Sequence, residues 1–400
     1  MSACKSWKNY TCGWTLAPGV VSLDYAVSSK SFVLNLSPDE VKHPEQGAMT
    51  QQILKHLDTG GAMVGWSEPE TVTVRYLAMS NSVVICGAPN LSFLASVAPG
   101  QSRALPYHRT PTAEKPAPLD RGKVYITFMS NEGDTAKNAF DLKEGSWMSP
   151  SRGKVPMSWG MEPILAELFP ALHDYYVDTA TDNDQWFAAC GGGGYTYPWL
   201  LPDPEQYFES ASELASRFMP AKDRWVDVWG SSHCPLKNGS SCAKGDETCN
   251  PCTEMYTRFR NASLAVAGGS ADGFSQRQTF NSSRRQYTQN VYLEDGTPVF
   301  SEPVTMWYPQ HGPCPAANLT LRDQCDCMKA QLELVAANNS RRPLFVPIYG
   351  AAMYVDVALC MSRRLPASKW AVVGVQDFAA LGRQAAPSHK EEARARKRVK

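Results

Sequence analysis

The chain has 400 residues, of which 43% are hydrophobic and 20% are charged. These values are typical of a globular protein with one large domain or two medium domains, and they exclude the disordered and fibrous classes. Lys and Arg together number 39, as do Asp and Glu, so the formal net charge is zero and gives no overall positive field for capturing nucleic acid.

The first 97 residues are predicted to form a small α/β domain. Residues 70–79 have the pattern of a helix, and residues 82–86 have that of a short buried strand. Residues 98–120 contain five prolines and little hydrophobic periodicity. That composition is typical of a linker between two structured parts.

From residue 121 to residue 385, short apolar strands alternate with helices. The predicted strands cover residues 123–129, 184–189, 225–229, 264–267, 304–307, 344–349 and 370–375. The predicted helices cover residues 162–176, 204–219, 324–337 and 352–364. This alternation predicts parallel strands with crossover helices. The segment suits a TIM-type (β/α)-barrel, which takes about 250 residues, with a doubly wound open sheet as the alternative.

Residues 386–400 form a strongly basic end of the chain, which is predicted to be a solvated tail. No apolar run in the chain reaches the roughly 18–20 residues that a membrane-spanning helix needs. Nucleic acid is therefore not an expected partner, and no transmembrane segment is expected.

Acidic residues follow two of the predicted strands, at the end of a barrel where catalytic residues gather. Glu132 and Asp134 come directly after the strand 123–129, and Gly133 between them allows a tight turn. Asp377 follows the strand 370–375, where a helix N-cap explains it equally well. A turn or a helix cap is also the alternative for Glu132 and Asp134.

A run of glycines at residues 191–194 follows the predicted strand 184–189 and leads into Tyr195, Tyr197 and Trp199. Glycines let the backbone approach a ligand closely, and aromatic rings offer flat faces for stacking. Packing in the core is the alternative for each aromatic residue. The run lacks the Lys-Ser/Thr of a Walker loop, and the prolines after it oppose the helix that dinucleotide binding requires. No cofactor is therefore predicted.

Paired carboxylates beside aromatic residues are the parts that hydrolysis of a glycosidic bond uses. Other hydrolase signatures are missing from the sequence. It contains no His-Glu-x-x-His motif and no Gly-x-Ser-x-Gly motif, which argues against a zinc hydrolase and a nucleophile-elbow hydrolase.

Twelve cysteines, seven of them between Cys234 and Cys327, predict disulfide bonds and an oxidising compartment. Eight Asn-x-Ser/Thr sites also favour a secreted or lumenal protein. The alternative for the cysteines is a zinc site made from Cys249, Cys252, Cys325 and Cys327. The first residues lack the apolar segment of a signal peptide, so either the true N-terminus is missing from the chain or the lumenal prediction is wrong.

The string Gly-Gly-Gly-Tyr-Thr-Tyr-Pro at residues 192–198 matches the motif GxGYxYP. The chain thus resembles the GxGYxYP family, which is grouped with the glycoside hydrolases. Segments that look like those of the family extend the resemblance over most of residues 60–385; they are residues 89–96, 125–138, 158–198, 342–350 and 363–384.

The resemblance implies a barrel-type glycosidase fold, a smaller and here truncated N-terminal domain, and a glycan as substrate. It implies that the cleft contains the residues Glu132, Asp134, Asp184, Tyr195 and Tyr197. At position 132, where the family is expected to carry Asp, this chain has Glu, which keeps the carboxylate but lengthens the side chain.

Glu302 also lies in a segment similar to that of the family. It would lie at the mouth of the barrel if the strand covers residues 297–300, and at the opposite face if the strand covers residues 304–307.

Together, these observations predict a secreted or lumenal glycoside hydrolase. Asp134 is expected to act with Glu302 or Asp377, and Glu132 is a further candidate for catalysis. The expected substrate-binding residues are Asp184, Gly192, Gly194, Tyr195, Tyr197 and Trp199. The alternatives are a carbohydrate-binding protein that keeps the cleft without catalysis, and a disulfide-stapled ectodomain without a ligand.

Overall fold

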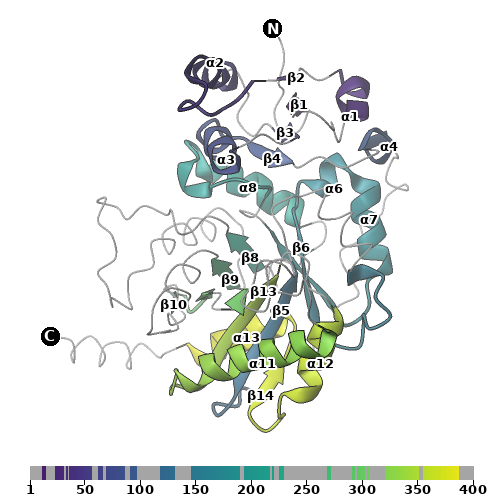
Figure 1. The fold of residues 1–400 in the computed structure, drawn as a ribbon, viewed down its shortest axis with the longest axis vertical. Helices are drawn as coiled ribbons and strands as arrows, with labels where there is room; N and C mark the ends of the chain where they lie inside the picture. Colours follow the sequence, from purple (N-terminus) through teal and green to yellow (C-terminus); the bar gives the residue numbers. More distant parts are fainter. Residues whose placement is uncertain are drawn as a thin grey trace, which may run out of the picture.

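The computed structural model describes two α/β units, an N-terminal one and a larger C-terminal one (Figure 1). The described residues are 11–14, 23–30, 33–34, 36–55, 62–65, 69–85, 91–96, 118–130, 146–189, 193–216, 219, 225–228, 268–271, 291–292, 295–301, 304–305, 320–350 and 355–386. The predicted linker and basic tail lie almost entirely outside these residues.

The N-terminal unit contains a parallel four-stranded sheet in the order β2-β1-β3-β4. Its strands are β1 (Thr11–Trp14), β2 (Val33–Leu34), β3 (Ala62–Val64) and β4 (Val83–Ile85). Its helices are α1 (Leu23–Ser28), α2 (Pro44–Leu54), α3 (Glu70–Met79) and α4 (Leu91–Ser96). The predicted helix 70–79 and the predicted strand around residues 82–86 are therefore confirmed.

The C-terminal unit is built on one ten-stranded sheet in the order β10-β11-β9-β8-β7-β6-β5-β13-β12, with β14 paired to β5. Its strands are β5 (Val124–Ser130), β6 (Met157–Met161), β7 (Asp184–Ala188), β8 (Trp225–Val228), β9 (Gly268–Ala271), β10 (Val291–Tyr292), β11 (Pro298–Ser301), β12 (Val304–Thr305), β13 (Leu344–Gly350) and β14 (Trp370–Val372). All described pairs are parallel except β10 with β11. The predicted α/β class with parallel strands is thus confirmed.

Helices connect these strands as the alternation predicted. They are α6 (Leu165–Leu168), α7 (Pro170–Thr179), the 3-10 helix η2 (Pro198–Leu200), α8 (Pro204–Ala215), α11 (Leu321–Ala337), α12 (Val355–Arg364) and α13 (Val375–Ala385). The predicted helix 162–176 is in fact two helices that begin only at Leu165. The strand expected at residues 264–267 lies outside the described residues, and β9 follows it directly.

The large sheet curls so that distant strands approach each other. Five strands separate β11 from β13 in the sheet order, yet the rings of Phe300 and Phe345 on these strands lie 5.5 Å apart. The chain also links the two ends of the sheet, because only two residues separate Ser301 of β11 from Val304 of β12. No described strand pair joins β10 to β12, so the structure shows a curled parallel sheet and the closed TIM barrel stays a prediction.

Helix α13 lies on the concave side of the curled sheet. It contacts strands β5, β7, β8, β9 and β11, which a single helix can reach only from the inside of the curve. Its Phe378 packs against Phe300, Phe345 and Trp225, with ring centroids 4.7, 5.2 and 5.9 Å away. This aromatic core fills the trough, whereas α6, α7, α11 and α12 contribute to the apolar core on the convex side.

Side chains from two strands hold the N-terminus of α13. Ser158 Oγ accepts a hydrogen bond from the Val375 amide at 3.1 Å, and Gln185 Oε1 accepts one from the Gln376 amide at 2.8 Å. These bonds satisfy amides that a helix leaves without internal partners. The N-cap is Gly374, where a Cβ atom would lie 2.2 Å from Gln185 Oε1, so only glycine fits without a shift.

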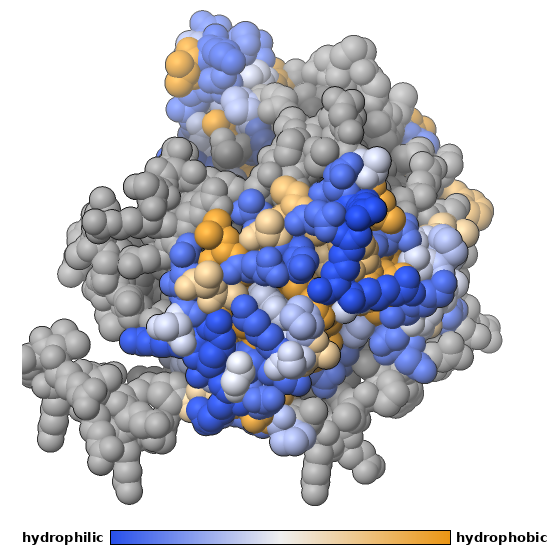
Figure 2. Space-filling view, turned by 60° about the horizontal axis from the view of Figure 1, so that its bottom comes forward, coloured by the Kyte–Doolittle hydropathy of each residue, from blue (hydrophilic) through white to orange (hydrophobic). Residues whose placement is uncertain are grey.

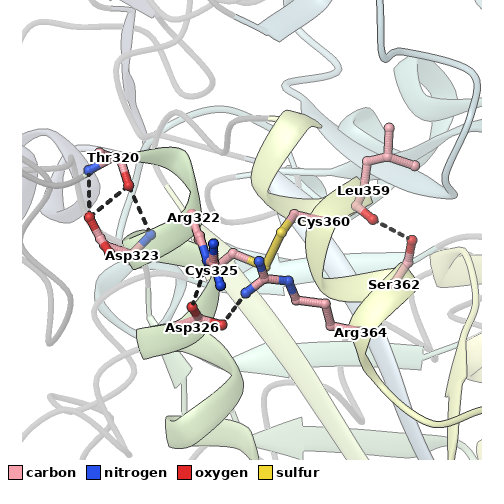
Figure 3. Close-up of a disulfide and its surroundings, with 9 residues drawn as sticks. All are labelled: Thr320, Arg322, Asp323, Cys325, Asp326, Leu359, Cys360, Ser362 and Arg364. Atoms are coloured by element: carbon pink, nitrogen blue, oxygen red, sulfur yellow. Dashed lines mark hydrogen bonds and ion pairs between the residues drawn. A yellow bond between two sulfur atoms is a disulfide. The ribbon is translucent and has the colours of Figure 1, made fainter.

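A disulfide bond joins Cys325 of α11 to Cys360 of α12, and an ion pair between Arg364 and Asp326 lies beside it (Figure 3). Cys327 is also disulfide-bonded. The prediction of disulfides is therefore confirmed, and the zinc site that needed the thiolates of Cys325 and Cys327 is wrong. Cys249 and Cys252 lie outside the described residues.

Replacing both Cys325 and Cys360 by Ala is expected to lower the free energy of unfolding by about 2–4 kcal/mol. The bond joins positions 35 residues apart, so its loss frees a long loop in the unfolded chain. Urea titration followed by circular dichroism measures the change. A reductant should destabilise the wild type more than the variant, and equal stabilities without reductant would contradict the prediction.

Hydrophilic residues dominate the described part of the face that Figure 2 presents, with hydrophobic residues showing between them. This is an ordinary protein surface, because folded proteins leave many apolar atoms exposed. Among the described helices, none is long and apolar enough to cross a membrane.

Candidate active site

Four of the predicted site residues lie outside the described residues: Glu132, Asp134, Gly192 and Glu302. Glu132 and Asp134 follow Ser130, the last residue of β5, by two and four positions. Glu302 directly follows Ser301, the last residue of β11. The alternative strand at residues 297–300 is therefore confirmed as β11, and the strand at 304 also exists as the short β12.

Glu162 is a carboxylate at a strand end that the sequence analysis missed. It follows Met161, the last residue of β6, and only 3% of its surface is exposed. In the sheet, β6 lies between β5 and β7, so Glu162 leaves the sheet between the end of β5 and the glycine-rich loop. The amide of Ile164 donates to the Gly193 carbonyl at 3.1 Å, which ties this segment to the loop.

The glycine-rich loop is held by the Tyr207 hydroxyl of α8. This oxygen accepts hydrogen bonds from the amides of Gly193 and Gly194 at 3.0 and 3.3 Å. A Cβ atom at position 194 would lie 3.1 Å from Val83 Cγ2 of β4. The requirement for glycine at this position therefore comes, in part, from close packing against the N-terminal unit.

The motif tyrosines are buried rather than open to a ligand. Tyr195 is 3% exposed and Tyr197 is 8% exposed, and their rings lie 6.3 Å apart in an edge-to-face arrangement. The Tyr195 hydroxyl donates a hydrogen bond to the carboxylate of Glu70, the first residue of α3. Neither ring presents a free face to solvent for stacking; of Trp199 only the backbone, in η2, is described.

Other aromatic residues near the predicted mouth also belong to the core. Trp159 and Trp186 are completely buried, and Tyr349 is 1% exposed. For these three residues, packing in the core is the correct explanation. The abundance of aromatic residues therefore reflects the large core more than a sugar-binding surface.

Asp184 is the first residue of β7, at the opposite end of the strand from the glycine-rich loop. Its carboxylate accepts hydrogen bonds from Arg152 Nη1 at 2.5 Å, from Trp159 Nε1 at 2.8 Å, and from the amide and hydroxyl of Thr181 at 2.8 and 2.7 Å. Its side chain is 0% exposed, and the Arg152 side chain is 15% exposed. The structure thus does not place Asp184 in the expected cleft. The hydrogen bonds and the ion pair of its carboxylate stabilise the fold instead.

Asp377 lies in the first turn of α13, so it is neither the N-cap, which is Gly374, nor the residue that ends a strand. The last residue of β14, Val372, pairs with Ile126. That is four residues before the end of β5, or about 13 Å short of the edge where the other strands end. Strand β14 thus ends well short of this edge, and Asp377 follows five residues after its last residue, inside α13.

Burial raises the pKa of the Asp377 carboxyl above its ordinary value of 3.8. The positive end of the helix would favour the charged form, so the cost of removing the carboxylate from water outweighs that effect. A raised pKa means that the folded chain binds this proton more tightly than the unfolded chain does. Asp377 therefore lowers stability as the pH rises through and above its ordinary pKa.

The variant Asp377→Asn is accordingly expected to be more stable than the wild type at neutral pH. The gain is expected to disappear below the ordinary pKa of 3.8, where the carboxyl is protonated in both states. Urea titrations at about pH 3 and pH 7 measure the difference. A gain of the same size at both values would contradict the prediction.

Two family models match the two units of this fold. The model described as "GxGYxYP putative glycoside hydrolase C-terminal domain" matches residues 122–383, and the one described as "GxGYxYP third domain" matches residues 19–96. The chain belongs to the GxGYxYP family. In this GxGYxYP protein, the motif that names the family lies in the loop after β7, at the contact between the two matched regions.

A solved structure shares the fold of this GxGYxYP protein. The crystal structure of "a putative hydrolase" from Bacteroides thetaiotaomicron VPI-5482 has a TM-score of 0.70, with 16% identical residues over 94% of this chain and 67% of that chain. At this identity, the similarity shows the fold alone. No curated protein matches the chain.

Proposed function

We propose that this protein is a glycoside hydrolase that uses a pair of carboxylates at the edge where the parallel strands of the curled sheet end. The observation that carries the proposal is Glu162, a buried carboxylate directly after β6 and beside the family motif. The description of the matching family model as "putative glycoside hydrolase" supports the same class of reaction. The substrate is a glycan.

Asp134 is the proposed first carboxylate, and Glu162 is its proposed partner. Ser130 of β5 pairs with Trp159 of β6, three residues before Glu162. A chain of four residues spans at most about 14 Å, so connectivity keeps Asp134 within that distance of Ser130. Two carboxyl groups about 5–5.5 Å apart would support cleavage with retention of configuration at the sugar carbon, and groups about 6.5–9.5 Å apart would support cleavage with inversion.

Glu302 is the alternative partner for Asp134. It lies in the two-residue link between β11 and β12, and Val304 of β12 pairs with Ile348 of β13, the strand beside β5. Chain connectivity therefore keeps Glu302 near the strand adjacent to β5. Asp377 is left out of the proposed pair because it lies within α13 and does not directly follow the end of a strand.

The proposed location is outside the cytosol. Disulfides persist in oxidising compartments and are rare in the cytosol, and the bond between Cys325 and Cys360 is buried on the Cys325 side between two helices. We therefore propose that the protein is secreted or lumenal.

A glycan array followed by an assay for reducing-sugar release on each glycan that binds tests the proposed function. The wild-type chain is expected to bind a defined glycan class and to release reducing sugar from it. Binding without release would overturn the hydrolase proposal and would instead identify a carbohydrate-recognition protein. The absence of both binding and release across the array would contradict both functions.

A further inference from the structure

The GxGYxYP loop contacts the N-terminal unit through neighbouring residues. Position 194 packs against Val83, the Tyr195 hydroxyl donates to Glu70, and the Thr196 hydroxyl donates to the Ser82 carbonyl at 3.3 Å. Shortly after the motif, the Asp203 amide donates to Asn81 Oδ1 at 2.9 Å. The loop therefore forms part of the contact between the two units.

The contact continues into a shared apolar core. Tyr195 and Tyr197 belong to the same buried cluster as Val74, Leu77 and Ala78 of α3. Glu70, which binds the Tyr195 hydroxyl, begins that helix. The position of α3 and the position of the loop are thus fixed together by packing and by a hydrogen bond to a carboxylate, which is among the stronger kinds.

The same loop is connected to the segment that carries Glu162. The Gly193 carbonyl accepts a hydrogen bond from the Ile164 amide, two residues after Glu162. Tyr207 of α8 holds the amides of Gly193 and Gly194 from the other side. Two hydrogen bonds and short stretches of backbone therefore connect Glu70, through Tyr195 and Gly193, to the strand end with the proposed carboxylate.

We propose that Tyr195 is a positioning residue whose bond to Glu70 fixes the glycine-rich loop on the N-terminal unit. The N-terminal unit is then a necessary part of the candidate site, because it sets the position of the loop beside Glu162. The claim that this contact positions a catalytic residue rests on the proposed function. The claim that the Tyr195–Glu70 bond holds the loop does not. In this role, the first tyrosine of the motif serves the contact between units and not sugar stacking.

Hydrogen–deuterium exchange of the full chain tests the proposal, with the backbone amides of residues 193–197 as the reporter. Tyr195→Phe and Glu70→Ala are each expected to speed exchange of these amides about tenfold, because a hydrogen bond to a charged group is lost. The double variant should show no further increase, since both changes remove one bond. Glu70→Gln keeps an acceptor oxygen and should restore most of the protection.

Tyr76→Phe is the matched control. Tyr76 also lies on α3 and donates to a carboxylate, that of Glu40, but this bond stays within the N-terminal unit. It should leave exchange at residues 193–197 unchanged. Unchanged exchange at these residues in Glu70→Ala, or equal increases in Tyr76→Phe, would overturn the proposal.

A kinetic measurement separates positioning from mere stability. With a glycan that the wild type cleaves, Tyr195→Phe is expected to lower kcat several-fold at a temperature where the variant remains folded, and Tyr76→Phe is expected to keep the wild-type kcat. Equal kcat values for Tyr195→Phe and wild type would overturn the link to the site. Because the exchange experiment needs no substrate, failure to find any turnover would count against the proposed function alone.

Discussion

Replacing Asp134 by Asn is expected to reduce the release of reducing sugar by about 10²- to 10⁴-fold while glycan binding is retained. The amide has nearly the shape of the carboxylate, so the glycan still fits, but it supplies neither a negative charge nor a proton acceptor. Initial rates on a glycan that the wild type cleaves measure the first effect. Titration of the same glycan measures the second.

The partner carboxylate can be identified in the same assay. Glu162→Gln is expected to reduce the release of reducing sugar as much as Asp134→Asn does. An acid–base pair gives a bell-shaped dependence of rate on pH, and the residual rate of this variant should lose one of the two sides of that curve. Glu302→Gln should keep most of the activity, and a loss as large as that of Asp134→Asn would make Glu302 the partner instead. Asp182→Asn, an exposed change on the loop before β7, is the control. Wild-type release by Asp134→Asn would remove Asp134 from the mechanism.

Replacing Asp184 by Asn is expected to lower the free energy of unfolding by about 3–5 kcal/mol. The change leaves the Arg152 guanidinium, 15% exposed, without its counter-charge. Arg152 is fixed there by further contacts: its Nε donates to the Trp147 carbonyl at 2.7 Å, and its guanidinium carbon lies 4.2 Å from the centroid of the Trp147 ring. The side chain therefore cannot turn to solvent without losing those contacts.

Urea titration followed by circular dichroism measures this loss. Asp182→Asn, two residues away and exposed, is the matched control and should change the free energy of unfolding by less than about 0.5 kcal/mol. A variant at position 184 that keeps wild-type stability but loses glycan binding would instead show that Asp184 serves the site.

Much of the C-terminal fold could be predicted from its sequence because strands buried on both faces consist of continuous apolar residues. This holds for β5 and β13, whose residues are buried throughout. Strand β6 could not be predicted in this way, since its sequence Met-Ser-Trp-Gly-Met contains no β-branched residue. It is a strand because β5 and β7 provide partners on both sides. Missing β6 also hid Glu162, which was assigned to the start of the predicted helix 162–176.

The site was predicted less well than the fold. Asp184 was assigned to the cleft from the family resemblance, although the predicted strand 184–189 already begins with it, as β7 does. Glu162 was missed because the strand that it follows, β6, was not predicted. Aromatic residues pose a similar problem. The ring of Tyr195 is of a kind that stacks on sugars, and yet it lies buried against the N-terminal unit. Only the three-dimensional contacts distinguish these cases.

The position of α13 has a consequence for how the protein is made. The aromatic side chains of β8, β11 and β13 that line the trough are synthesised before this helix, which begins at Val375. Because residues 375–385 are synthesised after those side chains, the inner core can be completed only late in the biosynthesis of the chain.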